Sequence, residues 1–196
     1  MIRSHSLPLL AGAALLLFLS ACDRGAPPPP ETPAEPPQAV AGPRLDVDGA
    51  RIAAADSEPG NWLSHGRTYD EQRFSPLDQI NDANVADLGL AWHYDFNTNR
   101  GLEATPIVVD GVMFATGSWS RVYALDARSG ELLWEYDPHV PPEWAVHACC
   151  DVVNRGVALW QGAVFVGTLD GRLISLDAAT GAVNWTVQTT DRGQPY

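Results

Sequence analysis

Basic side chains are scarce in this chain of 196 residues. It has 12 Lys and Arg against 24 Asp and Glu, which gives a formal net charge of -12. A protein that binds the phosphate backbone of DNA or RNA needs a basic face. The charge balance excludes that class of partner, and we expect no nucleic-acid binding.

Cysteine is scarcer still, with only Cys22, Cys149 and Cys150. Three cysteines allow one pair and leave one thiol over. The sequence also has no C-x-x-C-H segment. We therefore expect no c-type haem to be attached to these residues.

Long apolar runs are missing as well. The longest, from Leu7 to Leu19, is shorter than the ~20 residues that a helix needs to cross a bilayer. With Arg3 before it and small residues after it, the run is typical of a cleavable secretion signal over residues 1–22. The product is therefore expected to leave the cytoplasm.

The end of this signal, Leu19-Ser20-Ala21-Cys22, is similar to the bacterial lipobox. That resemblance implies a lipid on Cys22, and hence a periplasmic protein anchored to a membrane. Asp23, directly after the cysteine, favours the inner membrane. The alternative is an ordinary signal peptide cut after Ala21.

Residues 23–60 are predicted to be an extended, disordered linker. Its first part has few large apolar side chains and eight prolines, at positions 27 to 30, 33, 36, 37 and 43. Such a stretch cannot bury a core, and its prolines favour a polyproline conformation. The globular part is expected over residues 61–196, long enough for one domain or a piece of a larger one.

An internal repeat organises the globular part. Residues 111–134 align without gaps to residues 162–185, with an offset of 51. Each unit contains apolar, strand-like runs separated by Gly or Asp turns, which indicates a four-stranded antiparallel sheet. A sheet in each repeat of this length predicts an all-β propeller, with repeats over 104–138 and 155–191.

Two elements are expected before the first repeat. The segment Asp82–Leu90 is predicted to be a short helix, with Asp82 as its N-cap and Gly89 as its stop. The segment Leu90–Tyr94 is predicted to be a strand.

Cys149 and Cys150 are adjacent. Neighbouring Cα atoms lie about 3.8 Å apart, whereas ordinary disulfides place them roughly 4.4 to 6.8 Å apart. A bond between the two would be strained, and strain of that kind is kept at functional sites. The alternative is a pair of reduced thiols on opposite faces of a strand.

Two charged residues are also candidates for a site. Glu103 precedes a predicted strand, where a carboxylate is most often merely solvated. Arg155 follows the cysteines, and a surface ion pair with a residue such as Asp151 would account for it.

Several separated segments resemble the pyrroloquinoline quinone (PQQ) dependent alcohol dehydrogenases of bacteria, including their methanol dehydrogenases. They are G-L-E-A-T-P at 101–106, C-C-D-V-V-N-R-G at 149–156 and G-T-L-D-G-R-L-I-S-L-D-A-A-T-G at 167–181. The resemblance covers roughly residues 60–196 and implies the N-terminal part of an eight-bladed propeller, about two blades with an N-terminal strap. The strap is indicated by Trp62, Gly66, Arg73 and Ser75-Pro76-Leu77.

The repeats also resemble the tryptophan-docking pattern A-x-D-x-x-T-G-x-x-x-W of that family. The matching residues are Asp126, Ser129, Gly130 and Trp134 in the first repeat, and Asp177, Thr180, Gly181 and Trp185 in the second. Ser129 stands where the family has Thr. We expect these residues to be structural, each indole packing between neighbouring blades.

The resemblance implies a cofactor-binding role for five residues: Glu103, Cys149, Cys150, Val153 and Arg155. The cysteines would be joined as a disulfide ring that packs on one face of PQQ. The resemblance places the calcium ligands and the catalytic base beyond Tyr196, so neither a metal ligand nor a catalytic residue is expected in this chain. Asp151 and Asn154 are expected to be loop structure.

The function that the resemblance implies is oxidation of primary alcohols to aldehydes, with PQQ and calcium as cofactors and a cytochrome c as electron acceptor. The alternatives are a non-enzymatic propeller lipoprotein that serves as a scaffold, and an inactive truncated relic. A scaffold has no need of Glu103, Arg155 and the cysteine pair together, so their joint presence favours the enzyme. Two blades by themselves would leave sheet faces uncovered, so we expect the fragment alone to be inactive.

Overall fold

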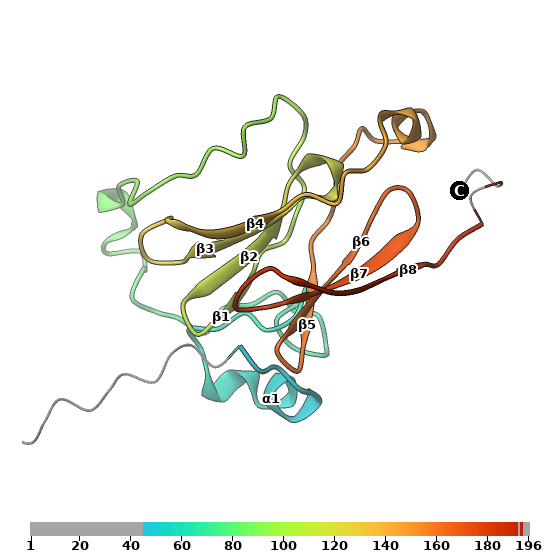
Figure 1. The fold of residues 1–196 in the computed structure, drawn as a ribbon. Coiled ribbons are helices and arrows are strands. Elements are labelled where there is room, and N and C mark those ends of the chain that lie inside the picture. Colours follow the sequence, from blue (N-terminus) through green and yellow to red (C-terminus); the bar gives the residue numbers. More distant parts are fainter. Residues whose placement is uncertain (1–44, 192, 194–196) are drawn as a thin grey trace, which may run out of the picture. The chain divides into compact units, whose positions relative to one another are not determined.

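The computed structural model describes residues 45–191 and residue 193, which all belong to the unit Val40–Tyr196 (Figure 1). The predicted signal peptide, the lipid site at Cys22 and the linker up to residue 44 lie outside the described residues. Among the residues described, no helix has the length and apolar character to cross a membrane.

The described elements are mostly strands. The helical ones are short: α1 (Gly49–Ala53), η1 (Ala55–Ser57), η2 (Val85–Asp87), η3 (Ser118–Ser120) and η4 (Pro142–His147). The strands are β1 (Ile107–Val109), β2 (Val112–Thr116), β3 (Val122–Asp126), β4 (Leu132–Tyr136), β5 (Ala158–Trp160), β6 (Ala163–Gly167), β7 (Arg172–Asp177) and β8 (Val183–Gln188).

The strands form two four-stranded antiparallel sheets, in the orders β1-β2-β3-β4 and β5-β6-β7-β8 (Figure 1). The second sheet repeats the first in detail. A register shift between Ala124 and Leu125 of β3 recurs between Ser175 and Leu176 of β7, 51 residues later. The predicted antiparallel sheet in each repeat is therefore confirmed.

The hydrophobic core takes side chains from both sheets. Phe114 of β2 and Val122 of β3 are buried in it together with Val164 of β6 and Ile174 of β7. Burial of these apolar side chains against a neighbouring sheet is the main favourable term for a propeller blade. Neither sheet could bury this face alone.

Trp134 connects the two sheets at the β7–β8 turn. Its indole Nε1 donates a hydrogen bond to the carbonyl of Ala178 (3.1 Å). The ring lies on Gly181, where an added Cβ would be 2.7 Å from Cε3 of the indole. The turn is held by Asp177, whose Oδ1 accepts hydrogen bonds from the backbone N–H and the hydroxyl of Thr180. The predicted docking role is therefore confirmed for Trp134 of the first repeat and for the Asp177–Gly181 turn of the second.

Trp92 makes the same contact with the first sheet. Its Nε1 donates to the carbonyl of Ala127 (3.2 Å), and an added Cβ on Gly130 would be 2.5 Å from its ring. In that turn, Asp126 accepts hydrogen bonds from Ser129, and the backbone N–H of Ser129 is the first cause of the lowered pKa of Asp126. Trp92 was not predicted to dock, although its place at the end of an apolar run, like that of Trp134, was the available signal.

The strand predicted over Leu90–Tyr94 is wrong for the described part of the chain. No strand is formed there, and Leu90 is 83% exposed. A strand requires a neighbouring strand for its backbone hydrogen bonds, and none of the described strands pairs with this segment. Instead, Trp92 packs on the Gly130 turn and Tyr94 packs against Tyr123 of β3.

The helix predicted over Asp82–Leu90 is also wrong. The segment forms only the 3₁₀ turn η2, and Asn84 rather than Asp82 is its N-cap. Val85 and Leu88 are exposed, so no apolar face is buried against the described residues. A helix this short is not stable without such packing.

The predicted linker over 23–60 ends earlier than expected, because residues 45–60 are folded. Asp48 caps α1 by accepting a hydrogen bond from the Arg51 backbone N–H, and Val47 and Ile52 are buried in the core. Arg51 also forms an ion pair with Asp110, in the β1–β2 turn (2.7 Å). This segment folds because it has apolar side chains that the core can bury. The proline-rich composition of the preceding residues obscured this difference in the sequence.

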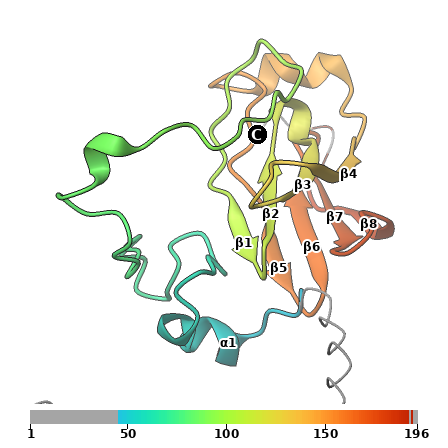
Figure 2. The same ribbon diagram turned by 90° about the vertical axis from the view of Figure 1, so that its left-hand side faces the viewer.

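The helix α1 lies beside the turns at one end of the two sheets (Figure 1, Figure 2). The backbone N–H of Gln161, in the β5–β6 turn, donates to the carbonyl of Val47 (2.9 Å). Trp62 pairs with Val108 of β1 as an isolated bridge. The N-terminal segment therefore connects the first strands of both repeats.

Replacing Gly181 by Ala tests the docking contact. Gly181 and Gly162 both have positive φ, of 72° and 76°, but an added Cβ at Gly162 meets nothing within 4 Å. Gly162→Ala should therefore lower the free energy of unfolding only by the cost of placing Ala in the left-handed conformation, about 1–2 kcal/mol. Gly181→Ala should lower it by about 1–3 kcal/mol more, because the indole must also move. Denaturant unfolding followed by tryptophan fluorescence measures the difference. Equal losses for the two variants would show that the indole is not tightly held.

Candidate functional site

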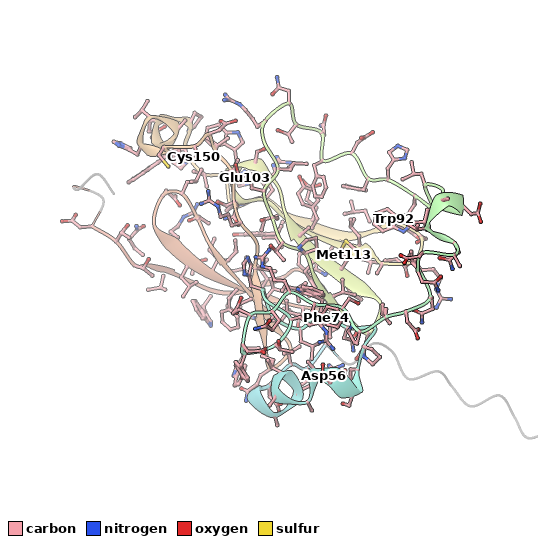
Figure 3. All side chains as sticks on the ribbon, turned by 180° about the vertical axis from the view of Figure 1, so that it is seen from behind. Asp56, Phe74, Trp92, Glu103, Met113 and Cys150 are labelled. Carbon is pink, nitrogen blue, oxygen red and sulfur yellow. The ribbon has the colours of Figure 1, made fainter. Side chains whose placement is uncertain are left out.

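The predicted site residues lie in connections at one end of the sheets, opposite the docking turns. Glu103 precedes β1, and residues 149–155 belong to the connection between β4 and β5. The β2–β3 turn, which contains η3, is at the same end. Figure 3 shows Glu103 and Cys150 close to each other there.

Glu103 and Arg155 form an ion pair, although they are 52 positions apart. Nη2 of Arg155 lies 3.1 Å from Oε2 of Glu103, and the side chains are 69% and 44% exposed. The backbone brings them together, because the N–H of Thr105 donates to the carbonyl of Arg155 (3.2 Å). Gly156 permits this approach: its φ is +126°, and a Cβ there would lie 2.9 Å from the carbonyl oxygen of Thr105.

The cysteine sulfur atoms lie on the same side of the chain, 2.7 Å apart. This geometry excludes the alternative of two thiols on opposite faces of a strand. The structure records both as free, exposed cysteines. The pKa of the Cys150 thiol is raised, first by its hydrogen bond with Cys149, while the nearby Arg155 guanidinium acts in the opposite direction.

Asp151 pairs with Arg100 rather than with Arg155. Nη1 of Arg100 donates to Oδ1 of Asp151 (2.9 Å), and the same oxygen accepts from the Val152 N–H (2.8 Å). The pKa of Asp151 is lowered, first by the Val152 N–H and also by Arg100 and Gly101. The partner that we had considered for Arg155 is therefore already engaged, and Glu103 takes its place.

Val152 and Val153 are buried beside the β2–β3 turn. The carbonyl of Val152 accepts a hydrogen bond from the Trp119 N–H (2.8 Å). A Cβ on Gly101 would be 3.2 Å from Cγ1 of Val153, so the two segments are in close contact. Val153 thus packs under the segment that carries Glu103.

Asn154 has a larger part than the loop role predicted for it. Its Nδ2 donates to the hydroxyl of Ser120 (3.2 Å) and to the carbonyl of Gly167 (2.9 Å), and its Oδ1 accepts from the Gly156 N–H (3.0 Å). It joins the β2–β3 turn of the first sheet to the end of β6 in the second. Periodic apolar residues indicate strands in a sequence, but a single amide that bonds to two sheets produces no such pattern. The sequence therefore contained no sign of this role for Asn154.

Two of the hollows at this end of the structure lie beside the predicted site residues. One of about 820 Å³ is lined by residues that include Arg100, Leu102, Trp119 and Tyr123. The other, of about 210 Å³, is lined by Ala148 beside the cysteines and by Trp144, His147 and Thr168. The ends of the site are therefore open to small molecules.

No group of three or more His, Cys, Asp and Glu side chains that could hold a metal ion occurs among the described residues. The charged pair Glu103–Arg155 and the adjacent sulfur atoms are the chemically distinctive groups at this end. They can offer a carboxylate, a permanent cation and a flat, polarisable surface to a polar planar ligand.

Residues 62–186 match a family profile described as the beta-propeller domain of glucose, ethanol and alcohol dehydrogenases that use PQQ. The match covers more than half of the chain. The chain belongs to this PQQ-dependent dehydrogenase family.

Individual relatives agree with that assignment. The chain is 65% identical over 144 residues to quinohemoprotein alcohol dehydrogenase ADH-IIG of Pseudomonas putida, covering 74% of this chain and 20% of the relative. It is 60% identical over 141 residues to the dehydrogenase subunit of the quinone alcohol dehydrogenase of Komagataeibacter europaeus, with 72% and 19% covered. The chain thus spans about a fifth of the length of these relatives.

Solved structures show the same relationship. The structure of ADHIIG from Pseudomonas putida HK5 superposes with a TM-score of 0.76 at 62% identity, covering 79% of this chain and 22% of that one. The quinohemoprotein alcohol dehydrogenase of Comamonas testosteroni gives 0.71 at 54% identity, with 74% and 22% covered. The two sheets therefore correspond to part of the propeller of these PQQ dehydrogenases, as predicted.

In the full-length protein, Asn154→Ala should lower the free energy of unfolding by about 1–3 kcal/mol, because it leaves the Gly167 carbonyl and the Gly156 N–H without their partner. Asn184→Ala is the control, since Asn184 donates only one recorded bond, to Ser175 (3.3 Å). Thermal unfolding of both variants measures the difference. An Asn154 variant as stable as the Asn184 variant would show that the amide does not join the sheets.

Proposed function

We propose that this chain is the N-terminal part of a PQQ-dependent alcohol dehydrogenase that oxidises primary alcohols to aldehydes. The observation that carries the proposal is the Glu103–Arg155 ion pair beside the two sulfur atoms, in a chain about 60% identical to quinoprotein alcohol dehydrogenases. Neither the ion pair nor the sulfur pair is needed to hold the sheets together.

The residues at this end fit PQQ by their chemistry. Glu103 and Arg155 are each at least 44% exposed, so their charged groups are available to a ligand. When bound, PQQ would supply the two-electron acceptor for the alcohol. Arg155 would place a permanent cation beside its carbonyl oxygens, Glu103 would contact its edge, and the cysteines would lie against one face, with Val153 beneath.

Further partners of the whole enzyme belong to the same proposal. A calcium ion would be held by residues outside those described. A cytochrome c would accept the electrons; a relative from Thauera butanivorans that is 56% identical over 138 residues is named 1-butanol dehydrogenase (cytochrome c).

Replacing Arg155 tests the cofactor site. In the full-length enzyme, Arg155→Gln should lower kcat by about 10²-fold, because one preorganised cation at a developing charge is lost, and should weaken PQQ binding to the apoenzyme. Arg155→Lys should recover part of both. Arg128→Gln, at the β3–β4 turn on the opposite end, is the control. A wild-type protein that binds no PQQ, or an Arg155→Gln variant that behaves like Arg128→Gln, would contradict the proposal.

We also propose that Cys149 and Cys150 are joined by a disulfide in the exported protein and that Cys22 carries a lipid that anchors it in the periplasm at the inner membrane. The 2.7 Å between the sulfur atoms supports the first proposal, and the segment Leu19–Cys22 supports the second.

Mass spectrometry of the exported, full-length protein tests both. The peptide containing Cys149 and Cys150 should resist alkylation until a reductant is added, and the mature N-terminus should be a lipid-modified Cys22. Two unlinked thiols in a protein that binds PQQ normally would refute the disulfide proposal. An unmodified N-terminus after Ala21 would refute the anchor.

A further inference from the structure

The ion pair between Arg100 and Asp151 connects two segments that each carry part of the proposed cofactor site. Arg100 lies three residues before Glu103, and Asp151 directly follows Cys150. The pair joins these segments at 2.9 Å, between the cysteines and Arg155 in the sequence of the second segment. The contact is not required by either sheet, since both residues lie outside the strands.

The backbone of Asp151 is in an unfavourable conformation. Its φ is 70°, in the left-handed region that only glycine enters freely, although Asp and Asn do so more readily than most other residues. Such a conformation persists only where the surroundings hold it. Here the carboxylate of Asp151 accepts from the Val152 N–H and from Arg100, which hold the turn immediately after the cysteines.

The two segments are also in contact below the ion pair. Gly101 lies against Val153, and the carbonyl of Val152 is fixed by the N–H of Trp119. Trp119 itself has a φ of 63°. The cysteine turn is therefore supported from beneath by buried valines. Arg100 ties it to the Glu103 segment by a second charged contact, besides the Glu103–Arg155 pair.

We propose that Arg100 and Asp151 are positioning residues: their ion pair holds the Cys149–Cys150 turn in place relative to Glu103, so that the two sides of the cofactor site are preformed before PQQ binds. The inference rests on the proposed function for its ligand. The held cysteine turn is a property of the cofactor-free protein and can be measured separately.

The test uses the full-length enzyme with Arg100→Gln, Asp151→Asn and the double variant. Asn retains an oxygen that can accept from the Val152 N–H and tolerates the left-handed conformation, so Asp151→Asn removes the charge with little other change. Arg121→Gln is the matched control, because Arg121 is 39% exposed against 49% for Arg100 and also pairs with carboxylates, Glu135 and Asp137.

The first measurement is made without PQQ. The rate at which Cys149 and Cys150 are alkylated in the apoenzyme, in the presence of a fixed amount of thiol reductant, should rise about five-fold in each single variant, the upper end for an ion pair between partly exposed side chains. The double variant should show no further rise, because both substitutions remove the same interaction. Arg121→Gln should match the wild type.

The second measurement is the affinity of the apoenzyme for PQQ, with the thermal midpoint as a check on folding. Affinity should fall about five-fold in both single variants, and the midpoint should stay within a few degrees of the wild type. Unchanged alkylation rates, additive effects in the double variant, or a midpoint that falls in step with the alkylation rate would each overturn the inference. If the wild type binds no PQQ, the proposed function fails, but the alkylation rates still decide whether this ion pair holds the turn.

Discussion

The contact between each tryptophan and the turn of the next sheet is the interaction on which the rest of this structure depends. A four-stranded sheet has two faces, and an isolated sheet of this size cannot bury either of them well. The indole of Trp134 fills the space between the sheets and also satisfies the carbonyl of Ala178. Trp92, which lies ahead of the first sheet in the chain, satisfies the carbonyl of Ala127 in the same way. The β7–β8 turn must place Gly181 against the indole ring of Trp134 and a carbonyl within reach of its N–H. The short docking motif therefore sets the spacing of the two sheets.

This arrangement leaves the other end of the sheets free to vary. The docking turns and α1 occupy one end, so the connections at the opposite end have no part in joining the blades through tryptophan. There the 149–156 segment is held instead by hydrogen bonds to the β2–β3 turn and to β6, chiefly through Asn154 and Val152. Rigid sheets thus carry a chemically specialised connection, which is how many enzymes position reactive groups.

Several unfavourable backbone conformations lie at this second end, although others, such as those of Asp110 and Gln161, lie in turns at the docking end. Asp151, Trp119 and Ser120 all have positive φ, and each lies in or against the segment that carries the cysteines and Arg155. Their positions agree with a site whose geometry is imposed by surrounding contacts rather than by local preference. The exposed Glu103 and Arg155 side chains then project from a well-supported base.

Sequence alone determined the repeat, its offset of 51 residues and the docking motif, whereas the residues proposed for the site were singled out by a family resemblance. The repeat and the motif are local features, because alternating apolar residues, glycine turns and short motifs indicate the same local structure whatever the rest of the chain does. The tertiary structure alone decided that Glu103 rather than Asp151 is the partner of Arg155, that Trp92 docks, that residues 45–60 fold and that Leu90–Tyr94 does not form a strand. Each of these outcomes depends on which distant parts of the chain come into contact. The free energy of such a contact depends on both segments together, so it cannot be read from the sequence of one segment.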